Sequence, residues 1–404
     1  MENQEQEIIF EEETHKPIIK LPKTLIAVAL TAVISVLASF TLFSFLYPEK
    51  VQNDKLTEID ALAKEHFYGD IDEKQISDGI MHGYVWGLGD KYSNYFSKED
   101  TEKRNSELDG SGQGIGLIVA KHPDTGNIYV DNVYDDAPAA KAGIRVGDQI
   151  TAVDSVRVSE RGYQQSVDDL KRENGATVVL TVLRNGKTFD TTVEYSQFVA
   201  QSVFGQMLES GIGYVEITSF NGGTYVQFKD TVDFLVEEGA KGLIFDLRNN
   251  GGGTVTAVTR IVDYLCPEGV IMTAKYADGT VETVAKSDAD EINLPMAVLT
   301  NGNTASASEI FAANLREFKK AVIVGEKTYG KGVMQTTYTL SDGSSVSLTV
   351  AEFFTHSGES FNNKGIAPDV EVKLSEEELK YFYQTALGDD RVVVAAEKEL
   401  LNGK

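Results

Sequence analysis

Between residues 304 and 314 the chain reads Thr304-Ala305-Ser306-Ala307-Ser308-Glu309-Ile310-Phe311-Ala312-Ala313-Asn314. The apolar run at 296–299 before it predicts a buried strand, and the apolar residues within 308–318 have helical spacing. A short polar turn at 301–304 joins the two. Such a turn exposes a hydroxyl at a helix N-terminus, where free N–H groups stabilise negative charge. A serine-rich helix cap has the same pattern, so this stretch alone does not establish a nucleophile.

Two more segments follow the same alternation of strand and helix. A strand-like run at 321–325 leads to Gly330-Lys331-Gly332-Val333-Met334-Gln335, and an apolar run at 242–247 leads to Arg248-Asn249-Asn250-Gly251-Gly252-Gly253. Helical spacing at 224–238 and 255–265 predicts an α/β domain with a buried sheet. Asp246 and Arg248 are expected to form a structural pair that shapes their loop. Glu309 is expected to cap the helix N-terminus.

The 404 residues include 62 acidic and 37 basic ones, which gives a formal net charge of −25. This balance argues against nucleic acid as a partner. The single cysteine, Cys266, excludes an internal disulfide and a thiolate metal cluster, and we expect it to be a small buried side chain. His66 and His82 lack a second ligand at metal spacing. We therefore expect no metal and no other cofactor.

An uncharged apolar segment at 25–47 is long enough for one membrane span of roughly 20 residues. Three lysines, Lys16, Lys20 and Lys23, precede it, and the positive-inside rule then keeps the N-terminus in the cytoplasm. We expect a cytoplasmic tail at 1–23, a transmembrane helix at 24–47 and an extracytoplasmic body. A cleaved signal peptide is the alternative, although no small-x-small site is clear before Pro48. Residues 48–109 have mainly helical spacing.

Residues 110–197 contain strand-like runs at 116–120, 128–133, 150–153, 177–183 and 188–195, and a helical stretch at 162–171. Between two of these runs lies Ala137-Pro138-Ala139-Ala140-Lys141-Ala142-Gly143-Ile144-Arg145-Val146-Gly147-Asp148-Gln149-Ile150. The region closely resembles a PDZ domain. The resemblance places the carboxylate-binding loop at Gly114-Ile115-Gly116-Leu117, where glycines let successive N–H groups converge on an anion. It implies a ligand polypeptide with a free C-terminus that adds as a strand and contacts Ile115, Gly116 and Leu117.

The segments that contain Arg248, Ser306 and Lys331 together resemble the C-terminal processing peptidases, a family of serine proteases with a Ser-Lys dyad. The resemblance covers roughly residues 54–374. It implies that Ser306 is the nucleophile and that Lys331, 25 positions later, is its base. It further implies that Gln335 positions the lysine, and that the oxyanion hole is formed by the N–H groups of Gly252 and Ala307.

The chain departs from the usual family pattern at Thr304, where a serine is common, and at Gly251, where a proline is common. Both positions lie beside the residues implied to be catalytic. The expected architecture is a mixed α/β and β multidomain protein: a transmembrane helix, a helical segment, a PDZ domain at 110–197 and a crotonase-like α/β serine protease core at 198–374. A charged, mainly helical segment is expected at 375–404.

A serine needs a base to attack an amide. His356 is the histidine of the α/β part, so a Ser-His-Asp triad is an alternative to the dyad. A lysine acts as a base when burial lowers its pKa from about 10.4. Gln335 follows Lys331 by four residues, so the two share a face in a strand or in a helix.

Two functions other than a protease fit parts of the sequence. In a PDZ scaffold with an inactive protease domain, the intact Ser306, Lys331 and Gln335 would have no role. A crotonase-like acyl transferase would share a related fold, but neither the PDZ domain nor the anchor suits it. The sequence therefore predicts a membrane-anchored extracytoplasmic serine endopeptidase that cleaves envelope or secreted proteins. It leaves open the natural substrate, the cleavage-site preference and the association of copies into a homo-oligomer.

Overall fold

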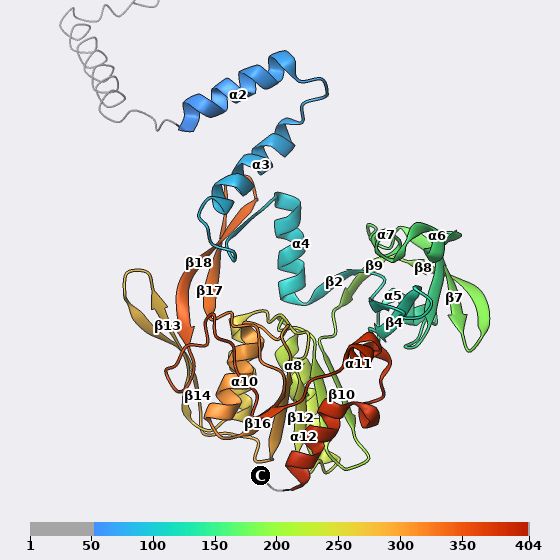
Figure 1. Ribbon diagram of the computed structural model, residues 1–404, viewed down its shortest axis with the longest axis vertical. Helices are drawn as coiled ribbons and strands as arrows, with labels where there is room; N and C mark the ends of the chain where they lie inside the picture. Colours follow the sequence, from blue (N-terminus) through green and yellow to red (C-terminus); the bar gives the residue numbers. More distant parts are fainter. Residues whose placement is uncertain (1–51, 403–404) are drawn as a thin grey trace, which may run out of the picture. The chain divides into compact units, whose positions relative to one another are not determined.

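The computed structural model describes residues 52–402, and the chain divides into two compact units between Ile76 and Ser77 (Figure 1). The first unit contains α2 (Gln52–His66) and the start of α3 (Glu73–Trp86). The predicted cytoplasmic tail and transmembrane helix at 1–47 lie outside the described residues. Among the described residues, none belongs to a helix long and apolar enough to cross a bilayer.

The second unit begins with the remainder of α3, followed by the short strand β1 (Asn94–Phe96) and α4 (Lys98–Asp109). Ser97 caps α4, since its side chain accepts a hydrogen bond from the Asp100 N–H. Gly110 ends the helix with a φ of 80°, a left-handed conformation that glycine adopts without steric cost. The helical character expected before residue 110 is confirmed for these helices, whereas β1 was not predicted.

The PDZ-like region forms one antiparallel sheet in the order β3-β4-β5-β7-β8, with β6 paired to β5. Its strands are β3 (Leu117–Lys121), β4 (Ile128–Val133), β5 (Gln149–Val153), β6 (Val156–Arg157), β7 (Thr177–Arg184) and β8 (Lys187–Glu194). The helices are α5 (Pro138–Lys141), α6 (Val158–Arg161) and α7 (Tyr163–Asp168). The five predicted strands are present. Strand β3 lies at the end of the sheet order, so one of its edges is unpaired within this sheet.

A two-stranded ladder of β2 (Ser111–Gly114) and β9 (Ser196–Val199) closes this region, because it pairs the segments that enter and leave it. Beyond it, a six-stranded sheet has the order β10-β11-β12-β15-β16-β19. The strands are β10 (Val203–Met207), β11 (Gly213–Ile217), β12 (Leu243–Asp246), β15 (Met296–Thr300), β16 (Ala321–Gly325) and β19 (Val370–Glu371). In this sheet β11, β12, β15, β16 and β19 are mutually parallel, as the alternation of strands and helices predicts.

Helices cover both faces of this sheet. Phe245 of β12 packs in a core with α8 (Thr224–Glu237), α9 (Val255–Leu265) and α10 (Ala307–Glu317). Its neighbour Ile244 points to the other face and packs with Val392 and Val393 of α12 (Arg391–Leu401). Successive residues of a strand face opposite sides, which explains why β12 and β15 are apolar throughout. The C-terminal helix is therefore an integral part of the protease core.

A second sheet contains β13 (Gly269–Tyr276), β14 (Val281–Ser287), β17 (Val333–Thr339) and β18 (Ser345–Phe354), with β1 as an added strand. Strands β17 and β18 form a long antiparallel hairpin, which Figure 1 shows in orange. The hairpin begins two residues after Lys331, and β1 pairs with its second strand. This pairing brings residues just before 94 to the hairpin that follows Lys331.

Candidate active site

Ser306 lies where the chain leaves β15 and enters α10. Its φ of 59° and ψ of −117° form a conformation that residues with a side chain rarely adopt. Strained residues of this kind persist only where neighbouring contacts hold them, and they cluster at active sites. The backbone therefore presents Ser306 at a helix N-terminus in a geometry that suits a nucleophile.

The two neighbouring hydroxyls anchor the loop. Thr304 Oγ1 donates to Leu247 O at 2.8 Å, and Ser308 Oγ donates to Asn250 O at 3.0 Å. Both side chains are fully buried. Because Ser308 already uses its proton in the protein interior, the half-buried Ser306 is the better candidate nucleophile of the two.

Glu309 occupies the first turn of α10 and is completely buried. Its Oε2 accepts the N–H of Ser306 at 2.9 Å and the N–H of Lys331 at 2.8 Å. Because both distances end at one oxygen, the two backbone nitrogens can be no more than 5.7 Å apart. The structure thus brings together the two residues that the sequence motifs single out, at the level of the main chain.

The Lys331 side chain is half-buried, and its Nζ lies 5.0 Å from the centroid of the Tyr92 ring. Burial lowers the pKa of Lys331, the charge of Arg104 lowers it further, and Asp90 opposes the change. Among the described residues, no hydrogen bond joins the side chains of Lys331 and Ser306. The lysine is therefore near the serine and has the pKa direction a base needs, while its amine rests on an aromatic ring.

The side-chain amide of Gln335 is hydrogen-bonded to residues other than Lys331 in this structure. Its side-chain amide donates to Thr349 Oγ1 at 3.1 Å and to Val333 O at 3.4 Å. The Thr349 N–H in turn donates to Ser93 Oγ at 3.1 Å. Sequence reasoning missed Tyr92 and Ser93 because they precede the hairpin by more than 230 positions, and only the pairing of β1 with β18 brings them here.

The two residues expected to form the oxyanion hole are adjacent. A Cβ on Gly252 would lie 2.8 Å from the Ala307 nitrogen, so only glycine allows this approach, and its φ is 103°. Ala307 begins α10, where N–H groups lack intrahelical acceptors. The Gly252 N–H, however, donates to Asn250 Oδ1 at 2.8 Å, so it is engaged within its own loop.

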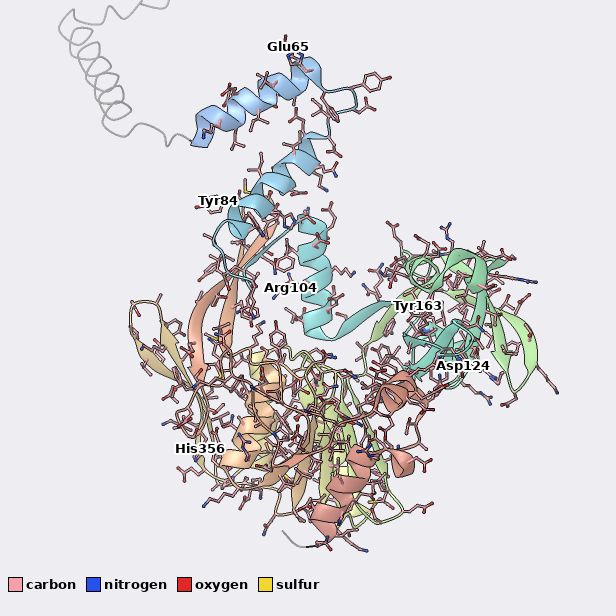
Figure 2. The ribbon with its side chains drawn as sticks, viewed as in Figure 1. Glu65, Tyr84, Arg104, Asp124, Tyr163 and His356 are labelled. Carbon is pink, nitrogen blue, oxygen red and sulfur yellow. The ribbon has the colours of Figure 1, made fainter. Side chains whose placement is uncertain are left out.

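His356 lies far from Ser306, at the opposite end of α10. Its ring stacks on Phe318 with centroids 3.9 Å apart, and its Nδ1 lies 3.0 Å from Val270 O. Figure 2 shows this residue at the periphery of the protease core. The 11 residues of α10 extend about 16 Å at roughly 1.5 Å per residue. This separation removes His356 as the base of a Ser-His-Asp triad.

Arg248 and Asp246 form the expected structural pair. The Arg248 guanidinium donates to both Asp246 oxygens and to Asp390 Oδ2 at 2.8 Å. Tyr214 Oη also donates to Asp246, at 2.8 Å. All these side chains are at most 8% exposed, which fits a structural role in shaping the loop.

The loop expected to bind a carboxylate has its carbonyls directed into the domain. Ile115 O accepts the Ala139 N–H at 2.8 Å, and Gly116 O accepts the Tyr134 N–H at 3.1 Å. In a trans peptide the N–H of the next residue points the opposite way, so the N–H groups of Gly116 and Leu117 point away from these partners. Gly116 has a φ of 75°, and a Cβ there would lie 2.1 Å from the Ala137 Cβ.

Comparison with known proteins finds family matches for both folded regions. Residues 111–195 match the PDZ domain family, and residues 211–372 match peptidase family S41. The chain is 33% identical to the carboxy-terminal processing protease CtpA of Bacillus subtilis over 323 residues, which cover 80% of this chain and 69% of that protein. It is 29% identical to a probable CtpA-like serine protease of Staphylococcus aureus over 352 residues, 86% of this chain and 70% of that protein.

The fold also resembles that of a putative S41 protease from Bacteroides fragilis, with a TM-score of 0.58 at 17% identity. That similarity covers 84% of this chain and 99% of the other. The PDZ match and the S41 match fall on the two folded regions in turn, and the Bacillus subtilis protease aligns over most of both chains. The chain belongs to the C-terminal processing serine proteases of peptidase family S41 that carry a PDZ domain.

Proposed function

We propose that this protease cleaves peptide bonds with a Ser306–Lys331 dyad, outside the cytoplasm and anchored to the membrane by residues 24–47. The main support for this dyad is that a single Glu309 oxygen accepts the main-chain N–H groups of both Ser306 and Lys331. It supports the dyad because it fixes a strained serine and a half-buried lysine within one short distance. Within the described protease core, His356 lies at the far end of α10 and is not placed to act as the base.

In the proposed reaction, Ser306 Oγ attacks the carbonyl carbon of the scissile peptide while the neutral Lys331 amine accepts its proton. The amine then passes that proton to the leaving nitrogen, and water hydrolyses the acyl-enzyme. Lys331 Nζ rests on Tyr92, so attack requires the flexible lysine side chain to turn from the ring towards Ser306. Gln335 would contribute to holding the amine only after leaving Thr349.

The negative charge on the carbonyl oxygen would be met first by the Ala307 N–H, at the start of α10. The Gly252 N–H would become a second donor after release from Asn250 Oδ1. Loss of one such donor costs about 10²–10³ in rate in other proteases. We infer that substrate binding shifts the loop at 249–253 enough to free this group.

Substitution of the dyad tests the chemistry with a fluorophosphonate probe and a quenched fluorogenic peptide. Ser306→Ala should abolish labelling and cleavage, and Lys331→Ala should nearly do so. Lys331→Arg should not restore activity, because a guanidinium stays protonated. The matched control is Ser308→Ala, which removes a hydroxyl two residues away and should keep activity in the folded protein. An active Ser306→Ala together with an inactive Ser308→Ala would contradict the assignment.

Substrate selection follows from the loop at Ile115, Gly116 and Leu117. We propose that it holds the free α-carboxylate of an unfolded polypeptide with an apolar last residue, whose backbone adds to the open edge of β3. Amidation of the C-terminus of the fluorogenic peptide should weaken binding and slow its cleavage. Equal cleavage of the acid and the amide by the full-length protein would exclude carboxylate capture.

Orientation in the membrane is tested separately from chemistry. The lysines before residue 24 predict that the body beyond Pro48 lies outside the cytoplasm. Protease added to intact spheroplasts should therefore digest the body, with a cytoplasmic marker as the control. A body that is protected while the N-terminus is accessible would reverse the proposed topology.

A further inference from the structure

We propose that Glu309 is a positioning residue for peptide cleavage, which holds the loop of Ser306 and the loop of Lys331 in register through one buried carboxylate. The proposal rests on the proposed function, since it concerns the geometry of the Ser306–Lys331 dyad. It extends beyond the role of helix cap, which needs only the contact with the first turn of α10.

The Glu309 carboxylate accepts four hydrogen bonds, two on each oxygen. Oε2 accepts the N–H groups of Ser306 and Lys331 at 2.9 Å and 2.8 Å. Oε1 accepts the Gly330 N–H at 2.7 Å and Thr328 Oγ1 at 2.5 Å. With 0% of Glu309 exposed, water cannot replace any partner that is lost.

Three of the four bonds reach a segment 19 to 22 positions further along the chain. A capping box at a helix start would have produced only the bond from Ser306. A second contact joins the same two loops, because the Tyr329 N–H donates to Thr304 O at 3.0 Å. The two contacts together fix the separation of the loops, and the carboxylate reaches the main chain of both reacting residues.

Gly330 shows how tightly the second loop is held. Its φ is 93°, and a Cβ there would lie 2.8 Å from the Gly365 nitrogen. Thr328 Oγ1 also accepts the Ile366 N–H at 2.7 Å, so the hydroxyl links Glu309 to the segment that follows the hairpin. These contacts restrain the loop, so movement of the carboxylate would displace Lys331 relative to Ser306.

Glu309→Gln is the sharpest perturbation because it keeps the size of the side chain. An amide has one oxygen and one NH2 group, so the two donors at one of the former carboxylate oxygens would face a donor instead of an acceptor. In one orientation Ser306 and Lys331 lose their shared acceptor, and in the other Gly330 and Thr328 lose theirs, so two of the four bonds are lost in either case. The helix cap and the shared acceptor of Ser306 and Lys331 survive only in the second orientation, and there the Lys331 loop loses its other two bonds to this side chain.

The matched control is Glu317→Gln, at the other end of the same helix. The Glu317 carboxylate likewise accepts a hydroxyl, from Thr355, and a backbone N–H, from Ser357, both at 2.8 Å. This variant makes the same chemical change on α10 without touching either loop. Both variants are compared with the wild-type protein by thermal unfolding and by kcat and KM on a quenched fluorogenic peptide with a free C-terminal alanine.

We expect Glu309→Gln to lower kcat by at least about 10²-fold, the cost of a displacement of roughly 1 Å between reacting groups, with KM nearly unchanged. Glu317→Gln should keep wild-type kcat. If Glu309→Gln fails to fold, Thr328→Val tests the same link through its donor, and Thr328→Ser should restore kcat. A kcat loss in the valine variant that serine reverses supports the proposal.

The proposal is overturned if folded Glu309→Gln, or Thr328→Val, keeps the wild-type kcat. It is also overturned if Glu317→Gln loses as much kcat as Glu309→Gln. Failure of the proposed function is recognised separately, because Ser306→Ala would then retain activity. An inactive Ser306→Ala beside a fully active Glu309→Gln would leave the dyad in place and reject Glu309 as a positioning residue.

Discussion

Replacement of Glu216 by glutamine should stabilise the protein at alkaline pH and leave it nearly unchanged in mild acid. Glu216 lies in β11, where its register partner on the next strand is Asp246. Burial raises the pKa of Glu216 to about 7 from the ordinary 4.5, and the neighbouring Asp246 adds to the rise. The folded protein therefore holds a proton that the unfolded chain has already released at neutral pH.

The size of the effect follows from that difference in pKa. Below pH 4.5 the carboxyl is protonated in both states, and stability is unaffected. Between pH 4.5 and about 7 only the folded state keeps the proton, so the free energy of unfolding falls as the pH rises. A rise in pKa from 4.5 to about 7 corresponds to about 3 kcal/mol, at about 1.4 kcal/mol for each tenfold change in acidity.

Urea unfolding at pH 5 and at pH 8 measures the prediction. At pH 5 Glu216→Gln and the wild-type protein should agree within about 1 kcal/mol, whereas at pH 8 the variant should be more stable by about 3 kcal/mol. Glu282→Gln, on the exposed strand β14, is the matched control and should follow the wild-type curve at both values. Equal stability of Glu216→Gln and wild type at pH 8 would refute the reasoning.

Three further substitutions probe the rest of the protease core. Arg248→Met should destabilise the protein by about 3–5 kcal/mol in urea unfolding, because it leaves two buried carboxylates without their cation. Phe311→Ala should lower the free energy of unfolding by about 3–5 kcal/mol, since the ring is fully buried among three other aromatic rings. A decrease of less than about 1 kcal/mol would contradict its central place in the core. Gly253→Ala should slow fluorophosphonate labelling by about 10²-fold, because its Cβ would lie 2.0 Å from Phe220 O; Gly251→Ala, with open space around its Cβ, should react normally.

Local patterns predicted the elements that carry the candidate nucleophile. The strand expected at 296–299 is β15, and the helix expected at 308–318 is α10. Both have strong signals, since a continuous apolar run marks a strand buried on two faces, and helical spacing marks a helix with one buried face. The loop between them is short, so the place of Ser306 at a helix N-terminus followed directly.

The surroundings of Lys331 could not be predicted from such patterns. Strands β13 and β14 alternate exposed and buried residues only weakly, and no strand was expected at 269–287. The contact of Lys331 with Tyr92 depends on β1, a strand of three residues that pairs with β18 about 250 positions away. Glu309 was recognised as a cap from its spacing to Ser306. Its bonds to 328–331 depend on tertiary packing that spacing does not encode.

The buried ion pair between Arg248 and Asp390 indicates the shortest part of this chain that we expect to fold as an active protease. The segment that matches peptidase family S41 ends at residue 372, yet Asp390 caps α12, and α12 covers one face of the central sheet. A protein shortened to the matched segment would expose that face. It would also leave the loop at 248–253, which adjoins Ser306, without one of its anchors. The catalytic unit therefore extends at least to Leu401, and a sequence match alone would place its end about one helix too early.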